Sequence, residues 1–141
     1  KWDLIEKNDT TADKFTREIK DVISKYSYLP IIYISALSGQ RIEKVIDMAT
    51  EAYNENNKRI TTSELNDFIA QAVARKHPPA KKGKYIKFNY VTQSEVSPPT
   101  FIFFSNYPEL VDKSYIGYLS TRLREEFGFS GVSFRIKFRK K

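Results

Sequence analysis

Hydrophobic residues in the first part of the chain recur at helical spacing on both sides of one continuous apolar run. One stripe lies between Thr11 and Pro30 and a second follows Arg41. Their members are Phe15, Ile19, Val22, Ile23 and Tyr26, then Ile42, Val45, Ile46, Ala49 and Tyr53. This spacing predicts two amphipathic helices. The run from Ile31 to Ile34 is typical of a buried parallel strand. The pattern therefore predicts the order helix–strand–loop–helix, the end of an α/β fold.

The rest of the chain alternates between helical and strand-like periods. Helical stripes follow Thr61 and Pro108, and strand-like patterns occupy residues 85–93, 100–105 and 132–139. The helical members are Leu65, Phe68, Ile69, Ala72 and Val73, then Val111, Tyr115, Leu119, Leu123 and Phe127. In the first strand, the pattern places Ile86, Phe88 and Tyr90 on one face. In the last strand, it places Val132, Phe134, Ile136 and Phe138 on one face. The order α-β-β-α-β predicts a second, α+β domain.

A polar stretch from Asn54 to Ile60 separates the two patterns and is interpreted as the linker. Thr61 and Glu64 then have the spacing of a capping box. In this motif the Thr side chain accepts from the backbone N–H of the Glu, and the Glu side chain accepts from the backbone N–H of the Thr. The predicted organisation is therefore a first domain at residues 1–57, a linker at 58–60 and a second domain at 61–141.

Charge divides at the same boundary. Residues 1–57 contain eight Lys or Arg against ten Asp or Glu, whereas residues 58–141 contain sixteen against seven, for net charges of −2 and +9. The second module is therefore the candidate for binding a polyanion. The chain has no cysteine, so disulfides and thiolate metal sites are excluded, and its one histidine, His77, is interpreted as a solvated loop residue. The absence of cysteine is compatible with a cytoplasmic setting. No signal peptide or membrane-length apolar run is visible, so no membrane partner is expected.

Two short segments carry candidate binding chemistry, Lys1-Trp2-Asp3 and Ser35-Ala36-Leu37. An ionised Asp3 can accept both the N1–H and the exocyclic NH₂ of guanine, whereas adenine lacks that pair of donors. Lys1 can lay its aliphatic stem over the base. The small residues Ser35 and Ala36 allow backbone N–H groups to approach guanine O6. The alternative for Asp3 is a carboxylate that serves only a turn or helix start.

These segments resemble the base-reading half of a Ras-like GTPase site, namely Asn-Lys-x-Asp followed by Ser-Ala-(Lys or Leu). The resemblance implies that Lys1, Asp3, Ser35, Ala36 and Leu37 bind guanine. The Asn of the first motif is missing from the sequence, which suggests a fragment of a longer protein.

The phosphate-binding half is also missing, because none of the five glycines stands in a GxxxxGK[ST] pattern. We therefore expect no catalytic residue in this chain, and neither tight GTP binding nor hydrolysis by these residues alone. Measurable turnover of labelled GTP by the isolated chain would contradict this.

Along its whole length the sequence resembles the EngA/Der family of bacterial ribosome-assembly GTPases. The motifs that carry this resemblance are Pro78-Pro79-Ala80-Lys81-Lys82-Gly83-Lys84, Pro98-Pro99-Thr100-Phe101, Tyr107-Pro108-Glu109-Leu110, Arg122-Leu123-Arg124-Glu125, Phe127-Gly128-Phe129-x-Gly131 and Phe138-Arg139-Lys140-Lys141. The resemblance implies the C-terminal part of a P-loop GTPase domain (α-β-α), followed by a KH-like domain (α-β-β-α-β). It also implies GTP or GDP as ligand with the Mg²⁺ ligands upstream, and the large ribosomal subunit with its rRNA as partner.

Two features bear on RNA binding by the second domain. Gly128-Phe129-Ser130-Gly131 has the GXXG spelling of a KH loop, but a helix C-cap at Gly128 and a turn at Gly131 explain both glycines without RNA. Basic residues form the stronger signal, because neutralised phosphates release counterions. The candidates are Lys81, Lys82, Lys84, Lys87, Arg135, Lys137 and Arg139. A solvated basic face is the alternative for these residues.

The aromatic residues of the strands are expected to be core rather than a base-stacking surface, and Phe101, Phe103, Phe134 and Phe138 are the main ones. Two functions therefore stay open for the second domain. It contacts rRNA, or it is mainly an intramolecular docking element that senses the nucleotide state of the upstream GTPase domains.

Overall fold

The computed structural model describes residues 1–141 except for the side chain of Lys25. The chain divides into two compact units, the first made of residues 1–53 and 130–132, the second of residues 54–129 and 133–141. The boundary between the units falls within helix α2, Ile42–Asn56, since residues 42–53 belong to the first unit and residues 54–56 to the second. The polar run that suggested a linker from Asn54 is therefore helical up to Asn56. Polar side chains on the exposed surface of a helix give the same sequence pattern as a linker.

The first unit contains helix α1, Thr11–Val22, and most of α2, with a 3₁₀ turn at Trp2–Leu4. Three aromatic rings pack together in it. Trp2 stacks on Tyr33 with ring centroids 4.3 Å apart and meets the ring of Phe15 edge-on at 5.8 Å. Trp2 is buried. This cluster fixes the 3₁₀ turn to the segment before Ser35.

The predicted strand at Ile31–Ile34 is wrong, because these residues form no strand and are only half-buried. Their backbone is tied by a bond from Trp2 N–H to Ile34 O at 2.9 Å. A parallel strand exists only when a neighbouring strand accepts and donates along its edge. Among the described residues of the first unit, no other segment forms a strand.

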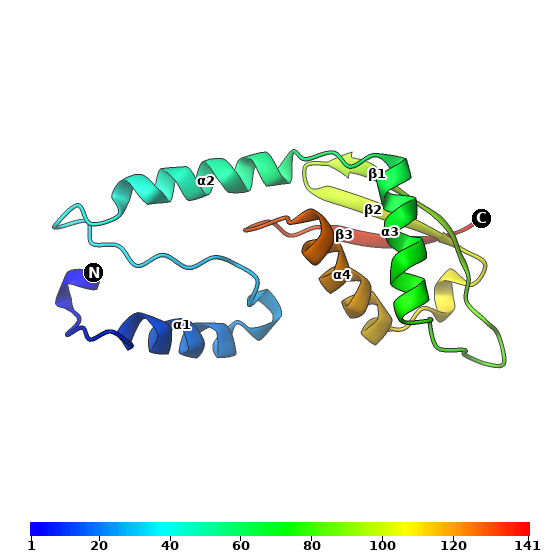
Figure 1. Ribbon diagram of the computed structural model, residues 1–141, viewed down its shortest axis with the longest axis horizontal. Helices are drawn as coiled ribbons and strands as arrows, with labels where there is room; N and C mark the ends of the chain where they lie inside the picture. The colour runs from blue at the N-terminus through cyan, green and yellow to red at the C-terminus, as the bar shows by residue number, and fades with distance from the viewer. The chain divides into compact units, whose positions relative to one another are not determined.

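The second unit has the predicted order α-β-β-α-β. Its elements are α3 (Thr62–Arg75), β1 (Phe88–Val96), β2 (Pro99–Ser105), α4 (Lys113–Phe127) and β3 (Arg135–Lys140). The sheet order is β1-β2-β3, with β1 antiparallel and β3 parallel to the central β2. Figure 1 shows α3 and α4 on the same side of this sheet. The hydrophobic core between these helices and the sheet is formed by Ile60, Leu65, Phe68, Ile69, Ala72, Val91, Phe101, Phe103, Tyr115, Leu119, Leu123 and Phe129.

The predicted shared face of Phe88 and Tyr90 is wrong. The register of β1 against β2 shifts between these residues, since Phe88 pairs with Ser105 while Tyr90 pairs with Phe104. Such a bulge places one extra residue on one strand and reverses the side-chain alternation beyond it. Phe88 therefore packs with Phe103 in the core, whereas Tyr90 stacks on Phe104, with centroids 4.3 Å apart.

The predicted capping box at the start of α3 is confirmed. Glu64 N–H donates to Thr61 Oγ1 at 3.3 Å, and Thr61 N–H donates to Glu64 Oε2 at 2.9 Å. The Thr61 hydroxyl, followed by its N–H, holds the pKa of Glu64 below its ordinary value because both bonds favour the carboxylate.

Replacement of Thr61 by alanine is expected to lower the free energy of unfolding at neutral pH by about 1 kcal/mol. Because the folded pKa of Glu64 is depressed, its contribution is present above the unfolded pKa and is lost as pH falls through the folded value. The difference between wild type and Thr61→Ala should therefore shrink on acidification, as measured by urea unfolding at several pH values. Thr62→Ala, one residue inside the helix, is the control, and an equal loss in both variants would contradict the assignment.

Candidate functional site

Asp3 and Ser35, which lie far apart in sequence, meet in the first unit. Asp3 lies in the 3₁₀ turn beside the buried Trp2, and the Ser35 hydroxyl donates to Asp3 Oδ1. Ser35 is fully buried, and its Oγ also accepts a bond from Ser38 N–H at 3.2 Å. The serine therefore connects the carboxylate with the loop that follows it.

This bond also favours the ionised form of Asp3. The Ser35 hydroxyl, and then the backbone N–H of Asp3 itself, lower the pKa of the carboxyl because both donate to its ionised form. An ionised carboxylate with one oxygen already bonded keeps lone pairs for two further donors. The group therefore fits the two donors on the edge of guanine.

The loop after Ser35 is a compact turn with exposed residues. Ser35 N–H donates to Gln40 O at 3.3 Å, and Gly39 has a φ of 71°, a conformation that favours glycine. Lys1, Ala36 and Leu37 are all exposed on the surface. The described side-chain bond within the predicted guanine set joins Asp3 and Ser35, so the roles of Lys1, Ala36 and Leu37 stay predictions.

The seven predicted RNA-binding residues form two groups in the second unit. Lys81, Lys82, Lys84 and Lys87 lie in or beside a tight turn, in which Lys81 and Lys84 exchange backbone bonds of 3.1 and 3.0 Å. Arg135, Lys137 and Arg139 alternate along β3 and are exposed, beside Thr100, Ile102 and Phe104 of β2. The first group surrounds a loop, and the second follows the sheet face away from the helices. Their part in RNA binding stays a prediction.

The aromatic residues expected in the core lie there. Phe101 and Phe103 are fully buried, and Phe134 and Phe138 are half-buried against the same core. The stacked pair of Tyr90 and Phe104 on the opposite face was not predicted. The bulge in β1 places Tyr90 on this face. The bulge depends on pairing with β2, so the sequence of β1 alone does not reveal it.

The structure of the GXXG segment, residues 128–131, fits a helix C-cap rather than an RNA-binding loop. Gly128, with a φ of 87°, is the C-cap of α4, and its N–H donates to Arg124 O. Phe129 is fully buried, with its N–H bonded to Glu55 Oε2 at 2.5 Å. Lys58 Nζ donates to Phe127 O at 2.7 Å, so the end of α2 and the residues after it hold this segment. A KH loop needs its central residues free for the RNA backbone, and here one of them is core.

The chain is similar to known proteins along its whole length. Residues 59–139 match the family described as KH-domain-like of EngA bacterial GTPase enzymes, C-terminal. The protein called GTPase Der from Clostridium botulinum is 47% identical over 141 residues, which is all of this chain and 32% of that protein. Proteins of the same name from Clostridium acetobutylicum and Alkaliphilus oremlandii are 44% and 43% identical over the same shares.

The chain thus spans about a third of the length of the curated relatives that it matches. Within the described residues, no helix has the length and apolar character that crossing a membrane would need.

Proposed function

This chain belongs to the EngA/Der family of bacterial GTPases, and we propose that it is part of a GTP-binding, GTP-hydrolysing factor for assembly of the large ribosomal subunit in the cytoplasm. In this proposal residues 1–57 carry the guanine-specificity half of a GTP site, and residues 61–141 form a KH-like domain that contacts rRNA. The observation that carries the proposal is the bond between Ser35 and Asp3, which presents an ionised carboxylate beside an exposed turn.

The guanine half fits a base and not a whole nucleotide. Asp3 supplies the acceptor for N1–H and NH₂, and the exposed residues Ala36 and Leu37 carry the backbone N–H groups that we assign to guanine O6. Among the residues of this chain, no phosphate-binding loop accompanies them. We therefore place the triphosphate and the Mg²⁺ that accompanies it on residues outside this chain.

Exposed apolar side chains support a longer first domain. Val22 of α1 is 86% exposed, and Ile46 of α2 is 66% exposed, although both belong to the stripes that predicted these helices. Amphipathic helices place such a stripe against other elements. We infer that these two helix faces are covered by the remainder of the GTPase domain.

The RNA-binding role rests on charge and exposure. Residues 58–141 have a net charge of +9, and the lysines of the turn at residues 81–84 are exposed. Cations grouped on an exposed turn bind phosphates in a way that depends strongly on salt.

A salt titration measures this role. Binding of the chain to large-subunit rRNA is expected to weaken steeply with salt, and replacement of Lys81, Lys82 and Lys84 by alanine should reduce the log–log slope by about 2–3 units. Fluorescence anisotropy at several salt concentrations is the measurement. The triple variant Lys14, Lys20 and Lys44 to alanine, in the first unit, is the charge-matched control. An unchanged slope in the first variant would refute this assignment.

One observation favours the second candidate function, intramolecular docking. Residues 130–132 come shortly after α4 in the sequence, yet they belong to the compact unit of residues 1–53. If docking dominates, the chain binds the upstream GTPase domains, and this binding persists after RNase treatment.

A further inference from the structure

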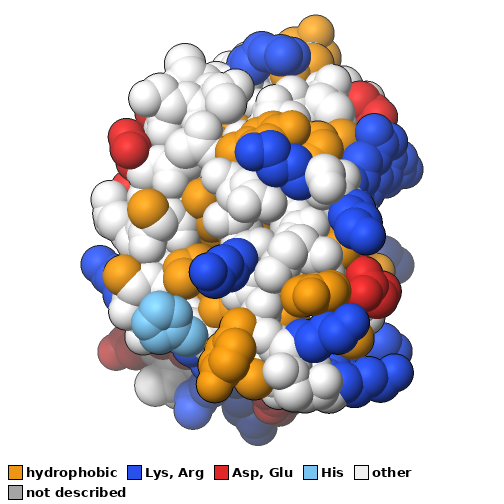
Figure 2. All heavy atoms as spheres, turned by 90° about the vertical axis from the view of Figure 1, so that its right-hand side faces the viewer, with side chains coloured by type: hydrophobic (Ala, Val, Ile, Leu, Met, Phe, Trp, Pro, Cys, Tyr) orange, Lys and Arg blue, Asp and Glu red, His pale blue; other side chains and the backbone are white. Residues whose placement is uncertain are grey.

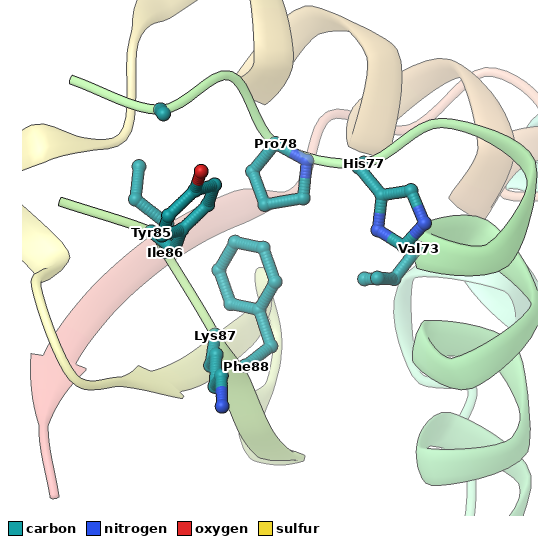
Figure 3. Close-up of a pocket in the computed structure, with 8 residues that line it drawn as sticks. Val73, His77, Pro78, Tyr85, Ile86, Lys87 and Phe88 are labelled. Atoms are coloured by element: carbon teal, nitrogen blue, oxygen red, sulfur yellow. The ribbon is translucent and has the colours of Figure 1, made fainter. Parts of the chain in front are cut away.

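The second unit contains a pocket of about 660 Å³ that no part of the guanine site or the basic sheet face uses. Its walls come from the end of α3, from the loop after it and from the segment that enters β1. Figure 3 shows Val73 and His77 on one side of it and Tyr85, Ile86 and Phe88 on the other. The lining residues are Val73, His77, Pro78, Ala80, Tyr85, Ile86, Lys87 and Phe88. A volume of this size is typical of small-ligand sites.

The pocket has an apolar floor and a polar, aromatic rim. Pro78 and Ile86 are buried at the floor, with Ile86 only 5% exposed. Tyr85 on the rim is 77% exposed, and His77 and Lys87 are exposed beside it. Large exposed aromatic side chains at the mouth of an apolar pocket mark a binding surface rather than a core.

The walls are held in place before any ligand arrives. Lys82 and Gly83 have φ values of 52° and 69°, the pattern of a type I′ turn, which closes the loop. Asn106, after β2, then fixes the segment entering β1. Its Nδ2 donates to Tyr85 O at 3.0 Å, and its Oδ1 accepts from Lys87 N–H at 2.8 Å. Tyr85 is thus exposed on a fixed backbone, which lowers the entropy lost on binding.

Positive charge lies at and near the opening. Lys87 lines it, and Lys84 lies nearby on the loop with its Nζ 4.5 Å from the centroid of the Tyr107 ring. Arg75 and Lys76 precede His77 directly. Among the described lining residues, none is acidic. Figure 2 shows His77, in pale blue, next to hydrophobic side chains and with Lys and Arg side chains around it.

We propose that this pocket binds a single unstacked base of an RNA strand, with Tyr85 and His77 as its stacking surfaces and Lys84 and Lys87 on the adjoining phosphates. The proposal rests on the RNA-binding part of the proposed function and specifies where RNA is read. Charge complementarity selects the occupant. An apolar peptide has no use for Lys87 in the lining and Lys84 on the adjoining turn, whereas a nucleotide needs both a flat apolar slot and a cation for its phosphate.

The location separates this pocket from a KH clamp. The GXXG segment lies after α4 and is tied to Glu55, while the pocket lies between α3 and β1. Base recognition in this domain would thus use a rigid loop pocket, and the sheet cations would track the phosphate backbone.

The first experiment measures affinity for a labelled single-stranded oligoadenylate of about 10 nucleotides and for an abasic oligomer of the same length. Tyr85→Ala is expected to weaken binding of the oligoadenylate about ten-fold while leaving its salt slope unchanged. Tyr85→Phe should retain wild-type affinity, because it keeps the ring. Lys87→Ala should instead lower the slope. Tyr53→Ala, another exposed tyrosine, on α2, is the matched control.

The second experiment uses His77 as a reporter, since it is the only histidine in the chain. Its imidazole proton signals should move upfield as oligoadenylate is added, because a stacked base shields them, and should not move with the abasic oligomer. Salt-dependent RNA binding with a stationary His77 signal and no effect of Tyr85→Ala would overturn the pocket and leave the proposed function standing. Absence of salt-dependent RNA binding altogether would overturn both the pocket and the RNA-binding part of the proposed function.

Discussion

Replacement of Phe129 by alanine is expected to lower the free energy of unfolding of the KH-like domain by about 3–5 kcal/mol. Its ring is fully buried and meets the rings of Phe101 and Phe134 edge-on, with centroids 5.7 and 5.4 Å away. Lys58 Nζ lies over its other face at 5.8 Å. Removing the ring leaves a cavity in a core whose neighbours are held by α3, α4 and β2. Urea unfolding measures the loss.

The neighbouring Ser130→Ala is the control. Ser130 is exposed, so its replacement should change the free energy of unfolding by less than about 0.5 kcal/mol. The pair distinguishes the two interpretations of the GXXG segment. A loop that exists to hold RNA would tolerate both substitutions in the free protein, and a small effect of Phe129→Ala would contradict its place in the core.

Replacement of Asp3 by asparagine in the full-length protein is expected to weaken GTP binding by at least about 100-fold. The amide presents an N–H donor where guanine also presents donors, so one hydrogen bond is lost and a repulsive contact replaces it. Xanthine has a carbonyl in place of the guanine NH₂ and can accept from that amide. The variant should therefore bind XTP more tightly than GTP. Competition between GTP and XTP in a filter-binding or fluorescence assay measures this change of preference.

The nearby exposed carboxylate Glu6 supplies the control, because Glu6→Gln removes the same charge without touching Ser35. Its GTP affinity should remain close to wild type. Equal losses in the two variants would show that Asp3 acts only through net charge, and an unchanged preference for guanine in Asp3→Asn would remove Asp3 from the base site.

Local signals predicted that the α-helices exist, but not all of their bounds. Val111, expected on the helical stripe after Pro108, lies before α4, which begins at Lys113. The capping box at Thr61 and Glu64 and the apolar stripe of α3 are local, and both were found as predicted. The strand patterns were less reliable, since Ile31–Ile34 has the composition of a strand but lacks a partner strand. The face of Tyr90 depends on a bulge that arises only when β1 pairs with β2. Pairing is a non-local property, and composition reports it poorly.

The candidate sites were likewise predictable where their signals are local in sequence motifs, and not where they depend on the folded arrangement. The proximity of Asp3 and Ser35 was predictable because both motifs have a known spacing, and the structure joins them by a hydrogen bond. The pocket beneath Tyr85 was not predictable, because its walls come from three separate segments. His77, interpreted from the sequence as a solvated loop residue, is exposed, but it also lines that pocket.

The parallel pairing of β2 with β3 has a consequence for how the domain reaches its folded state. The β1–β2 hairpin closes locally, whereas Thr100 meets Arg135 only after α4 has crossed between them. Until then one edge of β2, with Phe101 to Phe104 along it, offers unpaired backbone groups to any other chain. Refolding yield should therefore fall as protein concentration rises, because intermolecular strand addition competes with arrival of β3. High dilution during refolding is therefore expected to preserve the yield.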